Sequence, residues 1–361
     1  MIDKLPPLVI GDLEIKNPIV QGAMGIRVST HPLVSAVANA GAAGTIASVA
    51  LGFGNKENET NFLKASTDAL EYEIREVKKS SNGVFGVNIM VALSNYEDLA
   101  RTASREKVDY IVSGAGLPLK LPEYVDDPSI KLLPIVSSAR AADLIAKTWE
   151  KRYDRLPDGI VVEGPKAGGH LGFKNEEIVS AEPDALEKIT AEVIEVANNY
   201  GSKNGHKIPV IPGGGIFDGK DVARFFRLGA KGVQIASRFV TTYECSVSEE
   251  FKKLYLQATE DDILIIQSPV GMPGRAIRNE FIEKLLKDGR HPFICKYKCL
   301  KTCNPKTSPY CIAKALHSAA TGKIEEAVVF AGSNVSRINK IVHVQELIDE
   351  IIGEAIEELN R

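Results

Sequence analysis

The 361-residue sequence lacks the features that mark membrane, secreted and nucleic-acid-binding proteins. No stretch approaches the ~20 consecutive apolar residues of a membrane span, and residues 1–7 lack the basic start and apolar stretch of a signal peptide. Lysine and arginine number 44 against 47 aspartate and glutamate residues, and no basic run is interleaved with aromatic residues. This balance argues against nucleic acid as a partner. The sequence therefore predicts a cytoplasmic protein that works away from membranes and nucleic acids.

Two nucleotide-binding fingerprints are missing as well. No G-x-G-x-x-G follows the first apolar segment, and no G-x-x-x-x-G-K-[ST] occurs anywhere. A doubly wound open sheet that binds a nicotinamide cofactor is therefore disfavoured. Cysteine is scarce and unevenly placed, with four of the five residues between positions 295 and 311. Such crowding is unlike a secreted disulfide framework and favours metal binding or catalysis in a reducing compartment.

Short apolar segments alternate with amphipathic ones along the first 240 residues. Buried strands are predicted at 18–21, 42–48, 84–90, 109–113, 132–136, 159–163, 208–211 and 232–236. Helices are predicted at 32–40, 58–79, 96–107, 139–152, 183–200 and 219–228. Eight alternating units predict an α/β fold, a TIM (β/α)8 barrel over residues 1–260. Residues 261–361 are predicted to form a lid and a C-terminal extension, irregular and then helical, that packs on the barrel and carries the cysteine cluster.

A glycine-rich turn with one histidine follows the predicted strand at 159–163. Gly164, Gly168 and Gly169 remove Cβ atoms where a flat ligand could lie against the backbone. His170 carries a side chain that can exchange a proton near neutral pH. The turn therefore predicts an active site with His170 as its base, and the alternative is a glycine-rich hairpin with an incidental histidine.

Two later loops suit a phosphate group. TIM barrels commonly hold phosphate with the loops after their seventh and eighth strands. Here the first loop has three consecutive glycines, 213–215, followed by Asp218 as a helix N-cap, and the second has small residues, a hydroxyl and a guanidinium at 234–238. Together they predict a phosphate monoester site, whereas the glycine run alone would indicate only a tight turn.

The crowded cysteines follow the pattern C-x3-C-x3-C-x7-C, formed by Cys295, Cys299, Cys303 and Cys311. Four thiolates within seventeen residues suit a [4Fe–4S] cluster or a zinc ion. The paired C-x2-C knuckles typical of zinc sites are absent from this segment, which favours iron–sulfur. Unligated surface thiols are the third interpretation.

These motifs occur together, and in the same order, in the nitronate monooxygenase (2-nitropropane dioxygenase) family, which the chain resembles from residue 5 to beyond residue 240. The resemblance rests on segments 18–25, 86–88, 114–116, 167–170, 213–216 and 233–239. It implies a TIM-like barrel with FMN at its mouth and His170 as the catalytic base. The cofactor-binding residues that it implies are Gly22, Ala23, Met24, Asn88, Glu163, Gly168, Gly169, Gly214, Gly215, Gln234, Ala236 and Ser237.

The chain departs from most of that family at two places. Glu163 stands where most members have glutamine, and most members lack the cysteine cluster. Both features are similar to the branch that contains the bifunctional acyl-acyl-carrier-protein dehydrogenase/isomerase, an enzyme with FMN and [4Fe–4S]. The similarity implies that Cys295, Cys299, Cys303 and Cys311 hold such a cluster.

The expected function is that of an FMN-dependent oxidoreductase that oxidises nitronates or nitroalkanes, with His170 removing the proton α to the activating group. An acyl-acyl-carrier-protein dehydrogenase/isomerase or an enoyl-acyl-carrier-protein reductase is the alternative, and a non-catalytic flavin or iron–sulfur redox sensor is the second. The expected partners are a small-molecule nitronate or acyl thioester, an acyl carrier protein and a second copy of the chain in a homodimer. Arg275 and Arg278 are either ligand-binding residues or solvated surface arginines.

Overall fold

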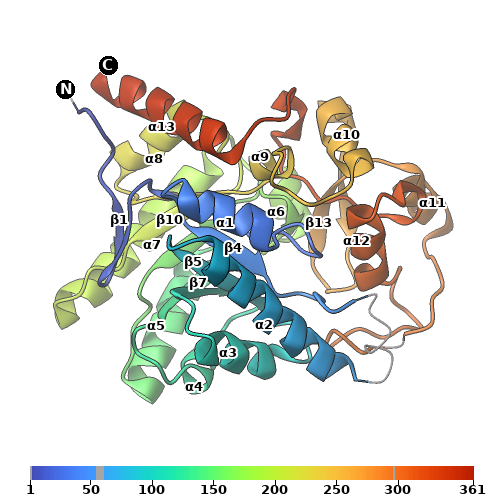
Figure 1. Cartoon of the computed structure of the whole chain (residues 1–361), viewed down its shortest axis with the longest axis horizontal. Helices are drawn as coiled ribbons and strands as arrows, with labels where there is room; N and C mark the ends of the chain where they lie inside the picture. The colour runs from blue at the N-terminus through green and yellow to red at the C-terminus, as the bar shows by residue number, and fades with distance from the viewer. Residues whose placement is uncertain (1, 54–60, 296) are drawn as a thin grey trace.

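A closed barrel of eight parallel strands forms the centre of the computed structural model, which describes residues 2–53, 61–295 and 297–361 (Figure 1). The hydrogen-bonded order is β3-β11-β10-β8-β7-β6-β5-β4, and a parallel bridge between Val20 and Ala43 joins the two end strands. The strands are β3 (Ile19–Gln21), β4 (Gly44–Ala47), β5 (Phe85–Met90), β6 (Tyr110–Gly114), β7 (Lys131–Val136), β8 (Ile160–Glu163), β10 (Val210–Gly213) and β11 (Val233–Ile235). The predicted TIM barrel and its eight strands are confirmed.

Helices surround the barrel as the alternation predicts. They are α1 (His31–Asn39), α2 (Phe62–Ser80), α3 (Tyr96–Arg105), α4 (Leu121–Tyr124), α5 (Ala139–Tyr153), α7 (Ala185–Asn204) and α8 (Gly219–Leu228). Helix α5 shows why these segments are helical: Ser138 Oγ accepts a hydrogen bond from the Ala141 N–H, and the buried side chains include Ala142, Ile145 and Trp149 at helical spacing. The start of the helix predicted at 58–79 lies partly outside the described residues.

The lower interior of the barrel is filled from several strands and from the N-terminal hairpin of β1 (Leu8–Ile10) and β2 (Leu13–Ile15). Tyr110 crosses this layer, and its hydroxyl donates to Gly44 O at 2.8 Å and lies 2.7 Å from Thr45 Oγ1. A Cβ at Gly86 would lie 2.5 Å from the Tyr110 ring, so glycine is required there. This plug closes one end of the barrel and leaves the other end, where the strands terminate at their carboxyl ends, for a ligand.

The chain after residue 260 is more regular than the sequence predicted. Strands β12 (Ile263–Gln267) and β13 (Pro273–Ile277) form an antiparallel hairpin, and β13 also pairs with β9 (Gly169–His170). The helices of the C-terminal third are α10 (Glu249–Gln257), α11 (Glu280–Asp288), α12 (Ile312–Ala320) and α13 (Val344–Asn360). The Pro- and Gly-punctuated chain that the sequence predicted to be irregular is found at the turn 268–273 and again at 289–311, where the described residues form no helix or strand apart from a bridge at Leu300.

Helix α13 returns the chain to the barrel, where it packs along α8 at the top of Figure 1. A Cβ at Gly219 would lie 2.3 Å from Ala355 N, so the two helices meet through a glycine. The Asn360 side chain exchanges two hydrogen bonds with the backbone of Ile2, which brings the described ends of the chain together. The predicted C-terminal helix is confirmed.

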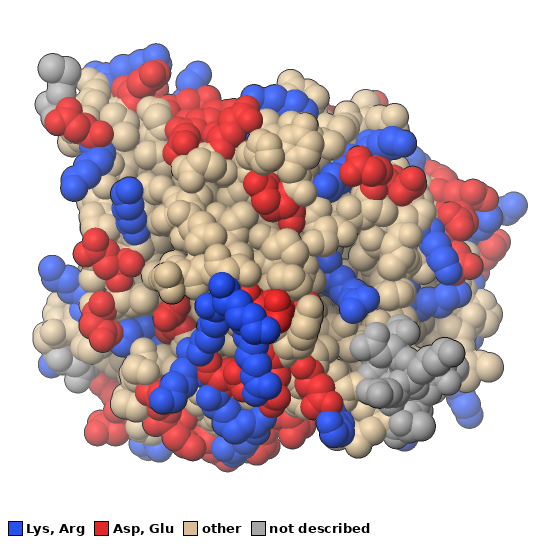
Figure 2. Space-filling model, in the orientation of Figure 1, with Lys and Arg blue, Asp and Glu red and all other residues tan. Residues whose placement is uncertain are grey.

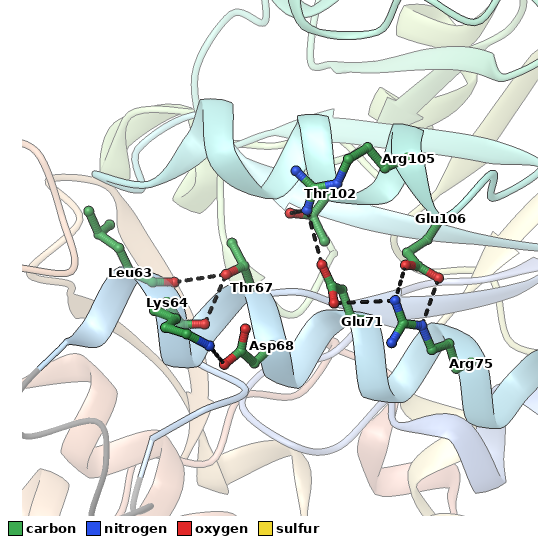
Figure 3. Close-up of polar contacts among 9 residues, drawn as sticks. All are labelled: Leu63, Lys64, Thr67, Asp68, Glu71, Arg75, Thr102, Arg105 and Glu106. Atoms are coloured by element: carbon green, nitrogen blue, oxygen red, sulfur yellow. Dashed lines mark hydrogen bonds and ion pairs between the residues drawn. The ribbon is translucent and has the colours of Figure 1, made fainter.

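The surface carries charges of both signs. Lysines and arginines are interspersed with aspartates and glutamates across the face in Figure 2. Helices α2 and α3 are linked by Arg75, which pairs with Glu106 at 2.5 Å, and by Arg105, which pairs with Glu71 at 3.0 Å (Figure 3). Exposed pairs of this kind contribute ~0–1 kcal/mol each, so they orient the helices more than they stabilise them. None of the described helices is long and apolar enough to cross a membrane.

Candidate active site

One cavity lies at the carboxyl ends of the barrel strands, and its lining includes every predicted base and cofactor residue. These residues are His170, Gly22, Ala23, Met24, Asn88, Glu163, Gly168, Gly169, Gly214, Gly215, Gln234, Ala236 and Ser237. They come from five barrel strands, from β9 and from the loops that follow these strands, although the sequence separates the first from the last by more than 200 positions. The barrel topology therefore brings the predicted site residues together.

The loop after β3 is fixed by a buried glutamine. Gln21 Nε2 donates to Gly22 O at 2.6 Å and to Ser29 Oγ at 2.8 Å, while its Oε1 accepts from Thr45 N at 3.0 Å. Ser29 Oγ in turn accepts from Met24 N at 3.0 Å. This network sets the backbone of residues 22–24 against the cavity, with every polar atom of the amide in use.

Part of the histidine turn, Gly169–His170, forms a short β-strand instead of an unpaired loop. His170 pairs with Gly274 of β13, its Nε2 lies 2.8 Å from Ser268 Oγ, and its ring packs edge-on against Phe330 with centroids 5.0 Å apart. Gly169 has φ +75°, and a Cβ at Gly168 would lie 2.5 Å from the Ala331 carbonyl carbon. Two glycines are therefore required for the turn to reach this position.

Burial lowers the pKa of His170 to about 4. The sequence predicted a base with a pKa near 7, so the structure corrects that expectation. Desolvation disfavours the imidazolium, since the low-dielectric surroundings cannot stabilise its charge as water does. The imidazole is consequently neutral at pH 7 and able to accept a proton.

Arg275 of β13 stabilises the same turn by hydrogen bonds to its backbone. Its buried guanidinium donates through Nη1 to Pro165 O at 2.7 Å and to Ala167 O at 2.6 Å, and burial lowers its pKa to about 10. Arg275 is therefore a charged residue whose guanidinium binds backbone carbonyl groups of the protein instead of a bound ligand. Arg278 pairs with Glu283 at the surface, as the second interpretation of this arginine predicted.

The glycine loop after β10 and the segment 236–238 after β11 form the other wall. Gly214 and Gly215 have φ +94° and +96°, and a Cβ at Gly214 would lie 2.9 Å from Ala167 Cβ. Asp218 caps α8 as predicted, with Oδ1 accepting from Asp221 N at 3.0 Å. The loop after β10 therefore lies directly against the backbone that leads into the histidine turn, with the Cβ position of Gly214 3.0 Å from Ala167 N.

A segment that sequence reasoning did not assign to the site, residues 328–334, crosses these loops. Gly332 N donates to Ser237 Oγ at 2.9 Å, Asn334 Nδ2 donates to Gly215 O at 2.7 Å, and Ser333 N donates to Lys166 O at 3.1 Å. Ser268, the partner of His170, was also missed as a site residue. Only the fold shows what these residues contact.

Glu163 ends β8 inside the cavity, in register with Gly213 of β10. No hydrogen bond or ion pair to its carboxyl group is found in the part of the chain that the structure describes, and burial raises its pKa to about 7. An ionised carboxylate in such a place would lack both water and a counter-charge. Glu163 is therefore largely protonated below pH 7.

The four clustered cysteines are partly buried free thiols. Burial raises the pKa of Cys299 to about 12, and Cys311, Cys295 and Cys303 lie close enough to raise it further through their charge. Cys299 also lines the cavity. Among the described residues, however, no three histidine, cysteine or acidic side chains are gathered into a metal-ligand geometry. The fold thus brings the thiols near one another without completing a metal site.

Comparison with known proteins identifies the family. A profile of the nitronate monooxygenase family matches residues 7–354. The chain belongs to this family. Membership confirms the resemblance seen in the sequence and the expectation of an FMN-dependent oxidoreductase. The similarity to the iron–sulfur branch stays a prediction.

Individual relatives differ in their named activities. A Mycobacterium tuberculosis protein named (3aS,4S,5R,7aS)-5-hydroxy-7a-methyl-1-oxo-octahydro-1H-indene-4-carboxyl-CoA dehydrogenase is 30% identical over 276 residues, covering 76% of this chain and 67% of its own. A probable nitronate monooxygenase from Staphylococcus saprophyticus is 28% identical, covering 78% and 81%. The structure of FabK from Thermotoga maritima superimposes with a TM-score of 0.75 at 26% identity, covering 96% of this chain and 94% of that one. The structural match thus spans the barrel and its extension, and the sequence relatives are named for different reactions.

The first prediction tests the glycine wall. Gly214→Val should give a folded but colourless protein that gains little flavin from added FMN, because the side chain would strain a left-handed backbone and collide with Ala167. Gly205→Val is the matched control, since Gly205 also has positive φ but nothing within 4 Å of its Cβ position. Flavin content is measured by absorbance and folding by circular dichroism. A fully flavinated Gly214→Val protein would remove this loop from the flavin site.

The second prediction concerns Glu163 and pH. Since its pKa rises from 4.5 to about 7 on folding, its contribution to stability is fully present below pH 4.5 and is lost as pH rises through 7. As pH rises, the free energy of unfolding of Glu163→Gln apoprotein should therefore increase relative to that of the wild-type apoprotein. The difference should reach about 1–3 kcal/mol at pH 8. Denaturant unfolding at pH 5, 6, 7 and 8 measures the difference, with Glu192→Gln on the exposed face of α7 as control. A constant difference across this range would show that Glu163 does not change its protonation on folding.

Proposed function

We propose that this chain is a cytoplasmic FMN-dependent oxidoreductase that oxidises nitronates or nitroalkanes, with His170 as its catalytic base. The observation that carries the proposal is a neutral imidazole in a cavity walled by backbone, one of whose nitrogens is engaged by Ser268. Its Nδ1 has no hydrogen-bond partner within the described residues. A positioned base of this kind contributes ~10²–10⁴ to the rate of proton transfer.

The residues present fit FMN. The loops at 22–24, 168–169 and 214–215 line the cavity with glycines at their exposed backbone, Gly22, Gly168, Gly214 and Gly215 among them, and this suits the close approach of a flat ring and a phosphate. Ser333 Oγ, also in the lining, is buried and has no hydrogen-bond partner among the described residues, so it is available to a phosphate oxygen. Bound FMN would supply a two-electron acceptor. Gly214, Gly215, Gln234, Ala236 and Ser237 would hold its phosphate end, and Met24, Asn88, Glu163 and Gly168 would line its ring.

A low resting pKa is compatible with this role. Burial that lowers the pKa of His170 keeps the imidazole unprotonated, and the anion formed by proton removal would raise that pKa by attraction. His170 therefore needs to accept a proton only when a carbon acid is bound beside it. The turn that carries it, paired with β13 and held by Arg275, fixes the direction of approach.

A second candidate substrate is an acyl thioester, which an apolar extension of the cavity favours. Beyond the glycine loops the lining continues with Leu93, Leu300, Ile312, Leu316 and Val328, from the barrel mouth to α12. Such a wall suits a hydrocarbon chain better than a small nitroalkane. The carboxyl-CoA dehydrogenase among the relatives acts on a thioester by its name. An acyl carrier protein and a homodimer partner remain predicted partners.

We also propose that Cys295, Cys299, Cys303 and Cys311 hold a [4Fe–4S] cluster. Support comes from the donor set, four thiols on one segment with the charges of the other three acting on Cys299. Thiolate is the ligand that such clusters require. A zinc ion on the same thiols is the competing interpretation.

The third prediction tests His170. His170→Gln should keep its flavin but reduce it at least ~100-fold more slowly with neutral 2-nitropropane, the low end of general-base contributions. The pre-ionised nitronate needs no base and should react near the wild-type rate. Stopped-flow absorbance under anaerobic conditions measures both, with exposed His206→Gln as control. Unchanged reduction by the neutral substrate would refute the base, and loss of flavin would make His170 a structural residue.

The same anaerobic titration separates the candidate functions. Bleaching by the nitroalkane or its nitronate supports the first, and bleaching by acyl thioesters alone supports the second. An enoyl thioester that reoxidises the reduced flavin would identify a reductase. Absence of turnover with all of them would favour the redox sensor.

The fourth prediction concerns the cysteines. Anaerobically purified protein should contain about four iron and four sulfide per chain and a broad absorption near ~400 nm beneath the flavin bands. Cys303→Ala should lower both contents and increase proteolysis between residues 290 and 312, because metal binding orders a segment that buries little surface itself. Cys245→Ala is the control, since Cys245 is buried elsewhere. Stoichiometric zinc without sulfide would show a zinc site in place of the cluster. Active protein that contains no metal would refute both the cluster and the zinc site.

A further inference from the structure

The turn between β12 and β13 presents one hydroxyl to the histidine ring. Ser268 Oγ lies 2.8 Å from His170 Nε2 and accepts a hydrogen bond from Val270 N at 3.3 Å. The backbone of Ser268 is fixed as well, because its N–H donates to Met272 O at 3.1 Å and its carbonyl accepts from Gly271 N at 2.9 Å. The hydroxyl is therefore held at a set position relative to the ring.

A serine this close to a histidine also resembles a nucleophile and its base. Two observations argue against that role. Ser268 is only 2% exposed and is not part of the cavity lining, so a substrate carbonyl cannot reach it. Within the described chain, no carboxylate orients the ring from Nδ1, as the third member of a hydrolytic triad would.

The position of one hydrogen decides what the ring can do. A neutral imidazole has a single N–H, so a proton can be accepted at Nδ1 only if the hydrogen is on Nε2. With the hydrogen there, Nε2 donates to Ser268 Oγ. With the opposite tautomer, Ser268 would donate to Nε2, and Nδ1 would carry a hydrogen and be unable to act as a base.

A neighbouring phenol can accept the serine hydrogen in the first arrangement and could donate to Ser268 Oγ in the second, so the choice between them rests on Nδ1 being the nitrogen that accepts the proton. The Tyr310 hydroxyl is buried beside Ser268 without meeting hydrogen-bond geometry, and no other partner is found for it in the described residues. Ser268 Oγ can accept from His170 and Val270 while its own hydrogen turns to the Tyr310 oxygen. A small adjustment then satisfies a buried oxygen that is otherwise left without a partner.

We propose that Ser268 is a positioning residue that fixes the tautomer of His170, with the hydrogen on Nε2 and Nδ1 free to accept the substrate proton. The inference rests on the proposed role of His170 as base. It goes further by naming the accepting nitrogen and the hydroxyl that selects it.

The direct test is nitrogen NMR of the purified, oxidised holoenzyme labelled with ¹⁵N-histidine. A protonated ring nitrogen and an unprotonated one have well-separated shifts, and the His170 signals are those lost in His170→Gln. We expect hydrogen on Nε2 in the wild type and a mixture or reversal in Ser268→Ala. Hydrogen on Nδ1 in the wild type would overturn the proposal, and this spectrum decides even if Ser268→Ala does not fold.

Kinetics give the second readout. Ser268→Ala should slow flavin reduction by neutral 2-nitropropane about 10–100-fold, the effect of losing one hydrogen bond to a charged group, with KM little changed. The pre-ionised nitronate should react at the wild-type rate, and Ser268→Thr, which keeps the hydroxyl, should restore the rate with the neutral substrate. Exposed Ser246→Ala is the control. Equal slowing with both substrates, or no slowing, would contradict the positioning role, whereas an unaffected His170→Gln would instead remove the proposed function itself.

Discussion

The pairing of β9 with β13 is the interaction on which the site depends. Two residues of the histidine turn, Gly169 and His170, form the edge of a sheet whose other strands come from a hairpin 100 residues later in the chain. Arg275 on the same hairpin donates to two carbonyls of that turn from a buried position. Removing the guanidinium would leave both carbonyls without partners, and an unsatisfied buried acceptor costs ~1–3 kcal/mol. The C-terminal extension therefore holds the histidine turn in place as well as covering it.

Sequence patterns predicted the barrel because each strand is bounded by a helix and the units repeat. They also predicted the cavity residues, since barrel strands place their following loops at one end. They could not predict that Ile263–Gln267 and Pro273–Ile277 pair with the histidine turn. That pairing joins segments far apart in sequence, and the short β9 carries no periodicity of its own.

Individual side chains also divide into those whose role the sequence predicted and those whose role only the fold shows. Gly214 was recognisable as a backbone-exposing residue, and its positive φ agrees with that prediction. Arg275 was not recognisable as a turn support, because a guanidinium in sequence looks the same whether it binds phosphate, a carboxylate or carbonyl groups. Ser268 and Tyr310 have no signal at all in one sequence, since their role comes only from the place where two loops meet. The cysteines were visible by spacing, but spacing does not state which metal they bind.

Burial sets the chemistry of the cavity by shifting two pKa values in opposite directions. It lowers the pKa of His170 to about 4 and raises that of Glu163 to about 7, so both groups are driven toward their neutral forms. Charges that develop during proton transfer then interact in a site of low dielectric with little fixed charge to oppose them. In the proposed reaction, the anion left by the substrate and the imidazolium would attract each other strongly, so the burial that lowers the pKa of His170 at rest would favour this charge pair once the proton moves. An ionised Glu163 would repel that anion, so the raised pKa of Glu163 would favour the proposed reaction.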